Sequence, residues 1–401
     1  MSRLCLFTAT YPFGKGETFL ENEIGFLSEA FGHVSVFPLW GEGRQRPTPE
    51  NVEVSPPLLP FVPKGNAKLV LKGLFNFAPL FPLLRCFFSE KAYAGKRKLW
   101  DYLTAFLLVR SIYPKVVASI KPDDLLYFYW GDKSAMLAPL LKRRLNNKII
   151  ARFHGSDLYE EVKKSRYIPF RKLLFQNLDA AVPIAEAGKS YLQRKYGVNA
   201  PKNIEVHKLG VFDRGLNPPS SEAVFHIASC SNLVPVKRVN LLAQAVGLLD
   251  FPVRWTHIGD GPGRADIEKI IGGFPKHIEG VLLGAMPNSG VLDFYQSHHI
   301  DVFVNVSSSE GIPVSIMEAI SFNIPVLATD VGGTSEIVDD TVGKLINPDL
   351  TPELLASKLT DLRNRLTSAA GTELRPRDKW AKEYNAELNY RDFCKMLKKL
   401  S

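Results

Sequence analysis

After an apolar run at 301–306, and continuing into an amphipathic segment at 313–322, the chain reads Ser307-Ser308-Ser309-Glu310-Gly311-Ile312-Pro313-Val314-Ser315-Ile316-Met317-Glu318-Ala319. Pro313 suits the first turn of a helix, where its missing N–H is no loss. Gly311 lets a ligand approach the backbone closely. The free N–H groups of the first turn favour an anion, helped by the helix dipole. This stretch therefore predicts a strand, an anion-binding loop and a helix, in that order.

Glu310 and Glu318 are the two carboxylates of this stretch, with seven residues between them. Glu318 stands among Met317, Ala319 and other apolar residues, where a carboxylate rarely lacks a partner. A pair of ligand hydroxyls, such as those of a ribose, is a suitable partner. The alternatives are an ordinary loop carboxylate for Glu310, and a solvated helix face or a buried ion pair for Glu318.

The same alternation of apolar runs and amphipathic segments extends through both halves of the chain, and predicts βαβ units with parallel sheets. In the second half we expect strands at 224–230, 253–258, 278–283, 301–306 and 325–329, and helices at 239–249, 264–271, 289–297 and 313–322. In the first half we expect strands at 4–8, 34–38, 125–129, 149–153 and 180–184, and helices at 18–30 and 134–145.

A proline and serine cluster at 217–221 interrupts the pattern and indicates a linker. We therefore predict an N-terminal domain over 1–216, a C-terminal domain over 217–377 and a helix over 378–401 that packs back on the N-terminal domain. Ligands of such sheets bind beyond the carboxyl ends of the strands, so the chemistry belongs to strand-to-helix loops.

The charge of the chain is uneven. Residues 1–220 have 32 Lys and Arg against 19 Asp and Glu, whereas 221–401 have 18 against 22. A basic half indicates an anionic partner: a phosphate-bearing substrate, a membrane surface or, least favoured for lack of any motif, nucleic acid. The four cysteines have no metal spacing and are typical of reduced thiols in a cytosolic protein. The N-terminus is interpreted as a strand and not a signal peptide.

The segment 58–88 mixes Leu, Phe and Pro with Lys64, Lys68, Lys72 and Arg85. Charge and proline interrupt every run long enough to span a bilayer, so a transmembrane helix is not expected. Two interpretations stay open: an interfacial amphipathic surface that contacts an anionic membrane, and a helical insertion packed on the domain.

The stretch from Glu310 to Glu318, followed by Gly332-Gly333-Thr334-Ser335-Glu336, resembles the E-x7-E signature of retaining GT-B glycosyltransferases, and most closely glycosyltransferase family 4. This resemblance implies a GT-B fold of two Rossmann-like doubly wound domains facing across a cleft. It implies that Glu310 lies near the donor sugar, that Glu318 binds the ribose, and that the backbone of five residues holds the diphosphate: Gly311, Ile312, Pro313, Val314 and Ser315.

Three further segments of the C-terminal half are similar to the family. In Leu233-Val234-Pro235-Val236-Lys237 the resemblance gives Lys237 the donor phosphates. The family has an Arg where this chain has Asn232, a departure for which Arg238 or Lys208 is a candidate substitute. Gly259 belongs to a glycine-rich turn, and Met286 to a loop that lies against the nucleotide base.

Two segments of the N-terminal half are similar as well. His154-Gly155-Ser156-Asp157 resembles the H-G-x-D loop of the family, which implies a sugar-facing His154 and an acceptor-side Asp157. The loop with Gly14, Gly16 and Thr18 resembles the glycine loop that closes over the donor phosphates, where Lys15 is also a candidate and Thr18 is equally suited to be an N-cap.

The resemblance therefore predicts a retaining, hexosyltransferase-type enzyme with His154, Lys237 and Glu310 as catalytic residues. We expect no cofactor besides the nucleotide-sugar donor, and no metal, because a Lys can supply the charge that a metal would. The acceptor is expected to be a bacterial surface glycan or lipid-linked sugar, and the location the cytoplasm, at the inner face of a membrane. The alternatives are a nucleotide-sugar epimerase of the same fold and a non-catalytic binder.

Overall fold

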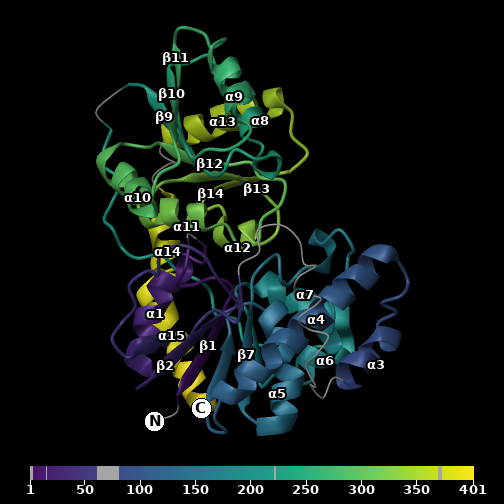
Figure 1. Ribbon diagram of the computed structural model, residues 1–401. Helices are drawn as coiled ribbons and strands as arrows, with labels where there is room; N and C mark the ends of the chain where they lie inside the picture. The colour runs from purple at the N-terminus through teal and green to yellow at the C-terminus, as the bar shows by residue number, and fades with distance from the viewer. Residues whose placement is uncertain (1–2, 15, 61–80, 221–222, 369–372) are drawn as a thin grey trace. The chain divides into compact units, whose positions relative to one another are not determined.

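The computed structural model describes residues 3–14, 16–60, 81–220, 223–368 and 373–401. The chain forms two compact units, the first of Met1–Leu209 with Tyr390–Ser401, and the second of Gly210–Asn389 (Figure 1). Lys15 and the part of the segment 58–88 that carries Lys64, Lys68 and Lys72 lie outside the described residues.

The first unit is built on a six-stranded parallel sheet with the order β4-β2-β1-β6-β7-β8. Counted along the chain, this is the order 3-2-1-4-5-6 of Rossmann folds. Its strands are β1 (Leu4–Thr8), β2 (Val34–Pro38), β4 (Val52–Val54), β6 (Leu125–Phe128), β7 (Lys148–Phe153) and β8 (Ala180–Pro183). A small pair, β3 (Trp40–Gly41) and β5 (Leu59–Pro60), lies beside it.

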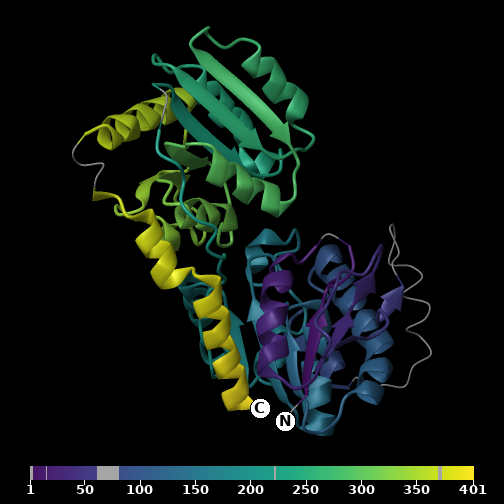
Figure 2. The same ribbon diagram turned by 90° about the vertical axis from the view of Figure 1, so that its left-hand side faces the viewer.

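Both faces of this sheet are covered, as the continuous apolar strands predict. Side chains alternate along β1, so Cys5 and Phe7 join one core cluster while Leu4 and Leu6 join the other. The helices are α1 (Phe19–Ala30), α3 (Phe81–Ser89), α4 (Lys96–Ser119), α5 (Ala138–Leu145), α6 (Arg171–Phe175), α7 (Glu186–Tyr196) and α15 (Ala386–Leu400). The last of these packs beside α1, as Figures 1 and 2 show.

The second unit repeats the architecture. Its sheet has the order β11-β10-β9-β12-β13-β14, again 3-2-1-4-5-6, and every pairing is parallel. The strands are β9 (Phe225–Cys230), β10 (Val253–Ile258), β11 (Ile278–Gly284), β12 (Val302–Asn305), β13 (Val326–Thr329) and β14 (Gly343–Ile346). The helices are α8 (Val239–Val246), α9 (Arg264–Ile271), α10 (Asn288–Ser297), α11 (Val314–Ser321), α12 (Thr334–Ile337), α13 (Pro352–Leu366) and α14 (Pro376–Glu383).

Most predicted strands and helices are confirmed to within one to three residues, but two differ in kind. The prediction of a single helix over 378–401 is wrong, because α14 ends at Glu383 and α15 begins at Ala386. The segment predicted as a helix from Ser134 begins as a 3-10 turn, η1 (Lys133–Leu137), before α5. Within the described residues, no helix is long and apolar enough to cross a membrane.

Candidate functional site

Lys237 and Glu310 meet at the point in the sheet of the second unit where the order of the strands reverses, between β9 and β12. Lys237 ends a 3-10 turn, η4 (Pro235–Lys237), after β9, and Glu310 lies in the loop after β12, the strand next to β9. In sheets with this strand order, ligands generally bind beyond the carboxyl ends of these two strands. Lys237 Nζ donates to Glu310 Oε1 over 2.6 Å. The structure thus joins two residues that the sequence analysis named separately.

The carboxylate of Glu310 is held in place by its own loop. Ser307 Oγ donates to Oε1 over 2.6 Å, and Asn305 Nδ2 reaches the same oxygen at 3.2 Å. Together with Lys237, three donors converge on one oxygen. Among the described residues none donates to Oε2, which leaves this atom free to accept a hydrogen bond from a ligand.

The loop of Glu310 is supported from behind by the glycine pair after β13. Gly332 has φ +57°, and a Cβ there would lie 1.9 Å from the carbonyl oxygen of Glu310. The N–H of Gly333 donates to the carbonyl of Gly311 over 2.7 Å. Only glycine fits such a close approach, so this pair sets the position of the loop.

The first turn of α11 presents its backbone donors beside Glu310. Pro313 precedes the helix, and no side chain caps it. In the described part of the chain, no protein acceptor takes the N–H groups of Gly311, Ile312, Val314 or Ser315. Unpaired N–H groups at a helix start bind anions, and the helix dipole adds to the effect.

Arg238 has a structural use of its own. Its guanidinium donates to the carbonyls of Val306, Ser307 and Pro348, over 2.7, 3.2 and 2.6 Å. Desolvation lowers the pKa of Arg238 from its usual value, because burial disfavours the charge. These contacts fix the start of the Ser307 loop. A direct contact of Arg238 with substrate stays a prediction.

Glu318 lies inside α11 with almost no exposure. Asn288 Nδ2, at the start of α10, donates to its Oε1 over 2.6 Å. Burial raises the pKa of Glu318 to about 7, and the bond from Asn288 opposes this only in part. A buried carboxylate with one neutral partner is poised to receive hydroxyl donors from a ligand.

The other predicted residues of this unit lie on neighbouring loops. Asn232 is exposed in the loop after β9. Gly259 follows β10 with φ +141°, and a Cβ there would lie 1.9 Å from the carbonyl oxygen of Ser231. Met286 is half-buried after β11, two residues before Asn288. The bond between Asn288 and Glu318 therefore ties the Met286 loop to α11.

In the first unit, Glu17 organises the glycine loop after β1. Its carboxylate accepts the N–H groups of Ala9, Thr10 and Tyr11 over 2.8, 2.6 and 2.6 Å. It also accepts the indole N–H of Trp130 over 2.6 Å. Gly14 and Gly16 are exposed in this loop.

Thr18 occupies the N-cap position of α1 and is exposed, but its side chain forms no capping hydrogen bond. Of its two suggested uses, the N-cap hydrogen bond is therefore not made. A contact between Thr18 and substrate stays a prediction.

His154 follows β7 and packs against two aromatic rings. Its ring centre lies 4.3 Å from that of Trp130 and 4.9 Å from that of Tyr129. Among the described residues neither imidazole nitrogen has a hydrogen-bond partner, although both are buried. Nδ1 lies 3.7 Å from Asp157 Oδ2, too long for a hydrogen bond. The ring is thus held by tilted contacts with two aromatic rings, and neither of its nitrogens is used by the described residues.

Asp157 is buried and shapes the loop around His154. Its two oxygens accept the N–H groups of His154 and Gly131, each over 2.8 Å. Burial by itself raises the pKa of Asp157, but His154 and these N–H donors outweigh burial and lower it. The carboxylate is thus ionised and occupied by the backbone, which supports a structural role beside the predicted acceptor-side one.

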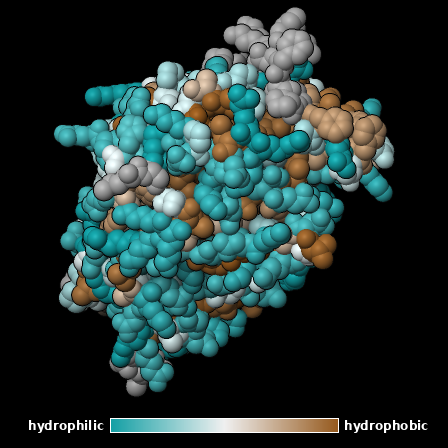
Figure 3. Space-filling model, turned by 90° about the horizontal axis from the view of Figure 1, so that it is seen from below, coloured by the Kyte–Doolittle hydropathy of each residue, from teal (hydrophilic) through white to brown (hydrophobic). Residues whose placement is uncertain are grey.

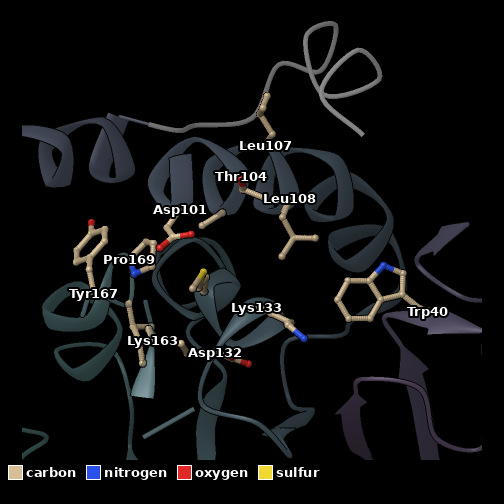
Figure 4. A pocket seen from close by; sticks show the side chains of 13 residues that line it. Trp40, Asp101, Thr104, Leu107, Leu108, Asp132, Lys133, Lys163, Tyr167 and Pro169 are labelled. Atoms are coloured by element: carbon tan, nitrogen blue, oxygen red, sulfur yellow. Dashed lines mark ion pairs between the residues drawn. The ribbon is translucent and has the colours of Figure 1, made fainter. Parts of the chain in front are cut away.

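A cavity of about 310 Å³ lies in the first unit between α4 and the segment that contains Lys163 and Tyr167 (Figure 4). Asp101, Thr104 and Leu108 point into it from α4, and Trp40 closes one side. Lys133 lies with its Nζ 4.6 Å from the ring centre of Trp40. A smaller cavity shares three of the residues that line it, and continues toward the strand ends, where it is lined by Ala9, Trp130 and Ser156.

Several residues that position the site were not predicted from the sequence. Ser307 and Asn305 anchor Glu310, Asn288 binds Glu318, and Glu17 holds the glycine loop. The position of Ser307 directly after a strand was an available signal for the first anchor. The partner of Glu318 lies on another helix, and no spacing in the sequence indicates it.

Comparison with known proteins shows that the second unit is similar to glycosyltransferases. Residues 218–368 match the family described as glycosyl transferases group 1. The chain is 23% identical over 308 residues to the amylovoran biosynthesis glycosyltransferase AmsK of Erwinia amylovora, covering 72% of this chain and 74% of that protein. It is 25% identical over 267 residues to the putative colanic acid biosynthesis glycosyltransferase WcaL of Escherichia coli, covering 64% and 65%.

Solved structures are similar over both units. The lipopolysaccharide outer core galactosyltransferase WaaB aligns with a TM-score of 0.70 and 14% identity over 99% of each chain. Anabaena HepE, solved in complex with UDP, aligns with a TM-score of 0.66 and 15% identity over 99% of this chain and 100% of that one. The chain therefore has the fold of GT-B glycosyltransferases, two Rossmann-like domains, and residues 218–368 are similar to the glycosyl transferases group 1 family.

Proposed function

We propose that this protein is a retaining glycosyltransferase of family 4 that moves a hexose from a nucleoside-diphosphate sugar to a glycan or lipid-linked acceptor. The observation that carries this proposal is the convergence of Lys237, Glu310 and the uncapped start of α11 beyond the ends of the neighbouring strands β9 and β12. Relatives named for amylovoran and colanic acid biosynthesis support a role in bacterial surface polysaccharide assembly.

The donor binds to the second unit in this proposal. The diphosphate takes the free N–H groups between Gly311 and Ser315, and Lys237 Nζ turns from Glu310 toward a phosphoryl oxygen. Glu318 accepts the ribose hydroxyls, and the Met286 loop lies against the base, next to Asn288. Anabaena HepE has been solved with UDP-glucose, which favours a uridine nucleotide as the first donor to test.

The chemistry follows from where charge develops. The bond between the anomeric carbon and the phosphate oxygen breaks, and the electron pair leaves with the phosphate. Lys237 stabilises this growing charge, which does the electrostatic work of a metal ion. The acceptor hydroxyl forms the new bond on the same face of the sugar, and its proton passes to the departing phosphate. Glu310 Oε2 accepts a sugar hydroxyl and orients the ring.

The first unit supplies the acceptor side. We assign the acceptor to the cavity between Trp40, Asp101 and Lys133, which combines an aromatic ring with groups that bind hydroxyls. His154 reaches the donor sugar through a nitrogen that has no protein partner among the described residues. We place the reaction in the cytoplasm, at the inner face of the membrane.

Binding of UDP-glucose, GDP-mannose and ADP-glucose, followed by thermal unfolding and by release of free sugar, tests the proposal. A donor that binds only the folded state raises the melting temperature by mass action. We expect one donor to do so, with slow hydrolysis, and the Lys237→Ala and Glu318→Ala variants to lose the shift. Binding without hydrolysis or transfer would favour a non-catalytic relative, and exchange at C2 of the sugar an epimerase.

A further inference from the structure

Large apolar side chains gather on the outer surface of α3 and the start of α4. Phe81 is 71% exposed, Phe88 72% and Trp100 58%, and Leu84, Tyr93 and Leu103 are exposed as well. At the upper right of Figure 3 such hydrophobic side chains stand out from the teal surface, on the side where α3 lies in Figure 1. These six residues are called the apolar face below.

The α3 residues of the apolar face form a strip along one side of that helix. On α3, Phe81, Leu84 and Phe88 follow one another at three and four residues, while Leu83 and Cys86 are buried on the opposite side. Residues at these intervals share one side of a helix. Soluble surfaces rarely gather so many large apolar side chains without a binding role.

Four exposed cations border the apolar face: Arg85, Lys91, Lys96 and Arg97. Within the described parts of the chain, none of them forms an ion pair. The acidic residues of this region are directed elsewhere. Glu90 accepts hydrogen bonds from Tyr167 and the N–H of Phe170, and Asp101 points into the cavity. The outer surface is therefore apolar and positive.

We propose that the apolar face docks on an anionic lipid bilayer, with Phe81, Phe88 and Trp100 inserted among the headgroups and the four cations on lipid phosphates. An apolar strip bordered by cations is what an interfacial contact with anionic lipid requires. A soluble protein partner would meet four unpaired cations that it must neutralise one by one. This inference deepens the proposed function and rests on the membrane location given there.

The same helix links the docking surface to the acceptor cavity. Trp100 and Leu103 lie on the exposed side of α4, whereas Asp101, Thr104 and Leu108 face the cavity. We infer that a headgroup-linked sugar enters the cavity past this helix from the bilayer. This arrangement selects the lipid-linked class of acceptor over a soluble glycan.

Flotation with vesicles tests the inference on the full chain. The vesicles are phosphatidylcholine alone, or phosphatidylcholine with phosphatidylglycerol at about 30%, at low salt. Two variants remove the two kinds of contact: Phe81→Ser with Phe88→Ser, and Lys96→Glu with Arg97→Glu. Two matched controls change exposed residues elsewhere: Leu248→Ser with Leu354→Ser, and Lys202→Glu with Lys276→Glu.

We expect the protein and both controls to float with anionic vesicles only. Removing two cations lowers the partition coefficient about 25-fold, at about fivefold for each, and the serine pair lowers it at least about tenfold. Equal loss in the controls, binding to neutral vesicles alone, or a dimer abolished by the serine pair would overturn the inference. Donor hydrolysis in detergent-free buffer stays unchanged in all four variants. A parent protein that hydrolyses no donor would count against the proposed function and not against the docking surface.

Discussion

Lys237 Nζ and Glu310 Oε1 lie 2.6 Å apart although 73 residues separate them. The two neighbouring strands β9 and β12 bring these residues together at the reversal point of the sheet. Ser307 and Asn305 hold the carboxylate in place. In the proposed mechanism, a donor phosphate competes with Glu310 for the cation. Lys237 can therefore change its partner from Glu310 to the substrate while the loop of Glu310 stays in place.

Replacing Lys237 by Met is expected to lower kcat/KM for transfer about 10²- to 10³-fold, the usual effect of removing one donor to a developing anion. The side chain keeps its length and apolar stem, so the melting temperature changes little. Steady-state kinetics with the donor that raises the melting temperature in the screen proposed above measure the effect. Lys237→Arg keeps a cation and should retain part of the activity.

If Lys237→Met raised only KM for the donor and left kcat unchanged, Lys237 would be a binding residue and not a stabiliser of the departing phosphate. The matched control is Lys344→Met, an exposed lysine on β14 that pairs with Asp340 over 3.5 Å. Its kinetics should equal those of the parent protein.

Glu318→Gln is expected to abolish the thermal shift by nucleotide while it stabilises the empty protein above pH 7. Burial raises the pKa of Glu318 to about 7. The folded state therefore binds one proton more than the unfolded state between about pH 4.5 and 7, and stability falls as pH rises through this window. The resulting destabilisation, fully present above pH 7, is about 3 kcal/mol.

Gln removes this charge and keeps an oxygen for the bond from Asn288. Urea unfolding at pH 5 and pH 8 measures the difference, which should be small at pH 5 and largest at pH 8. Equal stability of both proteins at pH 8 would mean that Glu318 is ionised without penalty, and that a further partner solvates it. Glu353→Gln, at an exposed helix start, is the control and should show no such pH dependence of the difference.

The fold can be predicted from the sequence more completely than the site. Parallel strands buried on both faces have continuous apolar runs, which is why 4–8, 34–38 and 253–258 were predicted with their observed bounds. Strand β14 was missed because two of its four residues, Gly343 and Lys344, interrupt the apolar pattern. The break between α14 and α15 was missed because both helices share one amphipathic pattern, and the interruption at Tyr384 and Asn385 has no proline or glycine.

Site residues were predictable where a motif marks them and not where a fold brings a partner from elsewhere. Glu310, Lys237 and His154 stand in local patterns next to strands. Asn288 and Glu17 act through contacts made across loops, and nothing in their neighbourhood signals this. The 24 residues of α4 were missed as well, since Pro114 inside this helix argues for a break.

Gly332→Ala is expected to reduce activity at least about tenfold and to lower stability by about 1–3 kcal/mol, the usual range for a strained backbone position. Alanine disfavours φ +57°, and its Cβ would collide with the carbonyl of Glu310. Gly273→Ala is the control, because its Cβ meets only an ordinary contact at 3.5 Å. Unchanged activity in Gly332→Ala would show that the Glu310 loop tolerates displacement.

Arg152→Met is expected to destabilise the first unit by about 3–5 kcal/mol, because it leaves a buried charge without its partner. Arg152 Nη1 donates to Glu23 Oε2 over 2.5 Å, and both side chains are fully buried. Lys148→Met, on the same strand, breaks an exposed pair with Asp179 and should cost at most about 1 kcal/mol. Urea unfolding followed by tryptophan fluorescence measures both.

Leu108→Trp is expected to fill the cavity beside α4 and to raise KM for the acceptor about tenfold, while donor hydrolysis stays unchanged. The indole adds volume to a space of about 310 Å³ that Asp101 and Lys133 also line. Hydrolysis of the donor needs no acceptor, so the two readouts separate the acceptor site from the donor site. Leu103→Trp, on the exposed side of the same helix, should leave both constants unchanged in detergent-solubilised assays. A parallel loss of hydrolysis in Leu108→Trp would remove the cavity as the acceptor site, because a change confined to acceptor binding cannot slow attack by water.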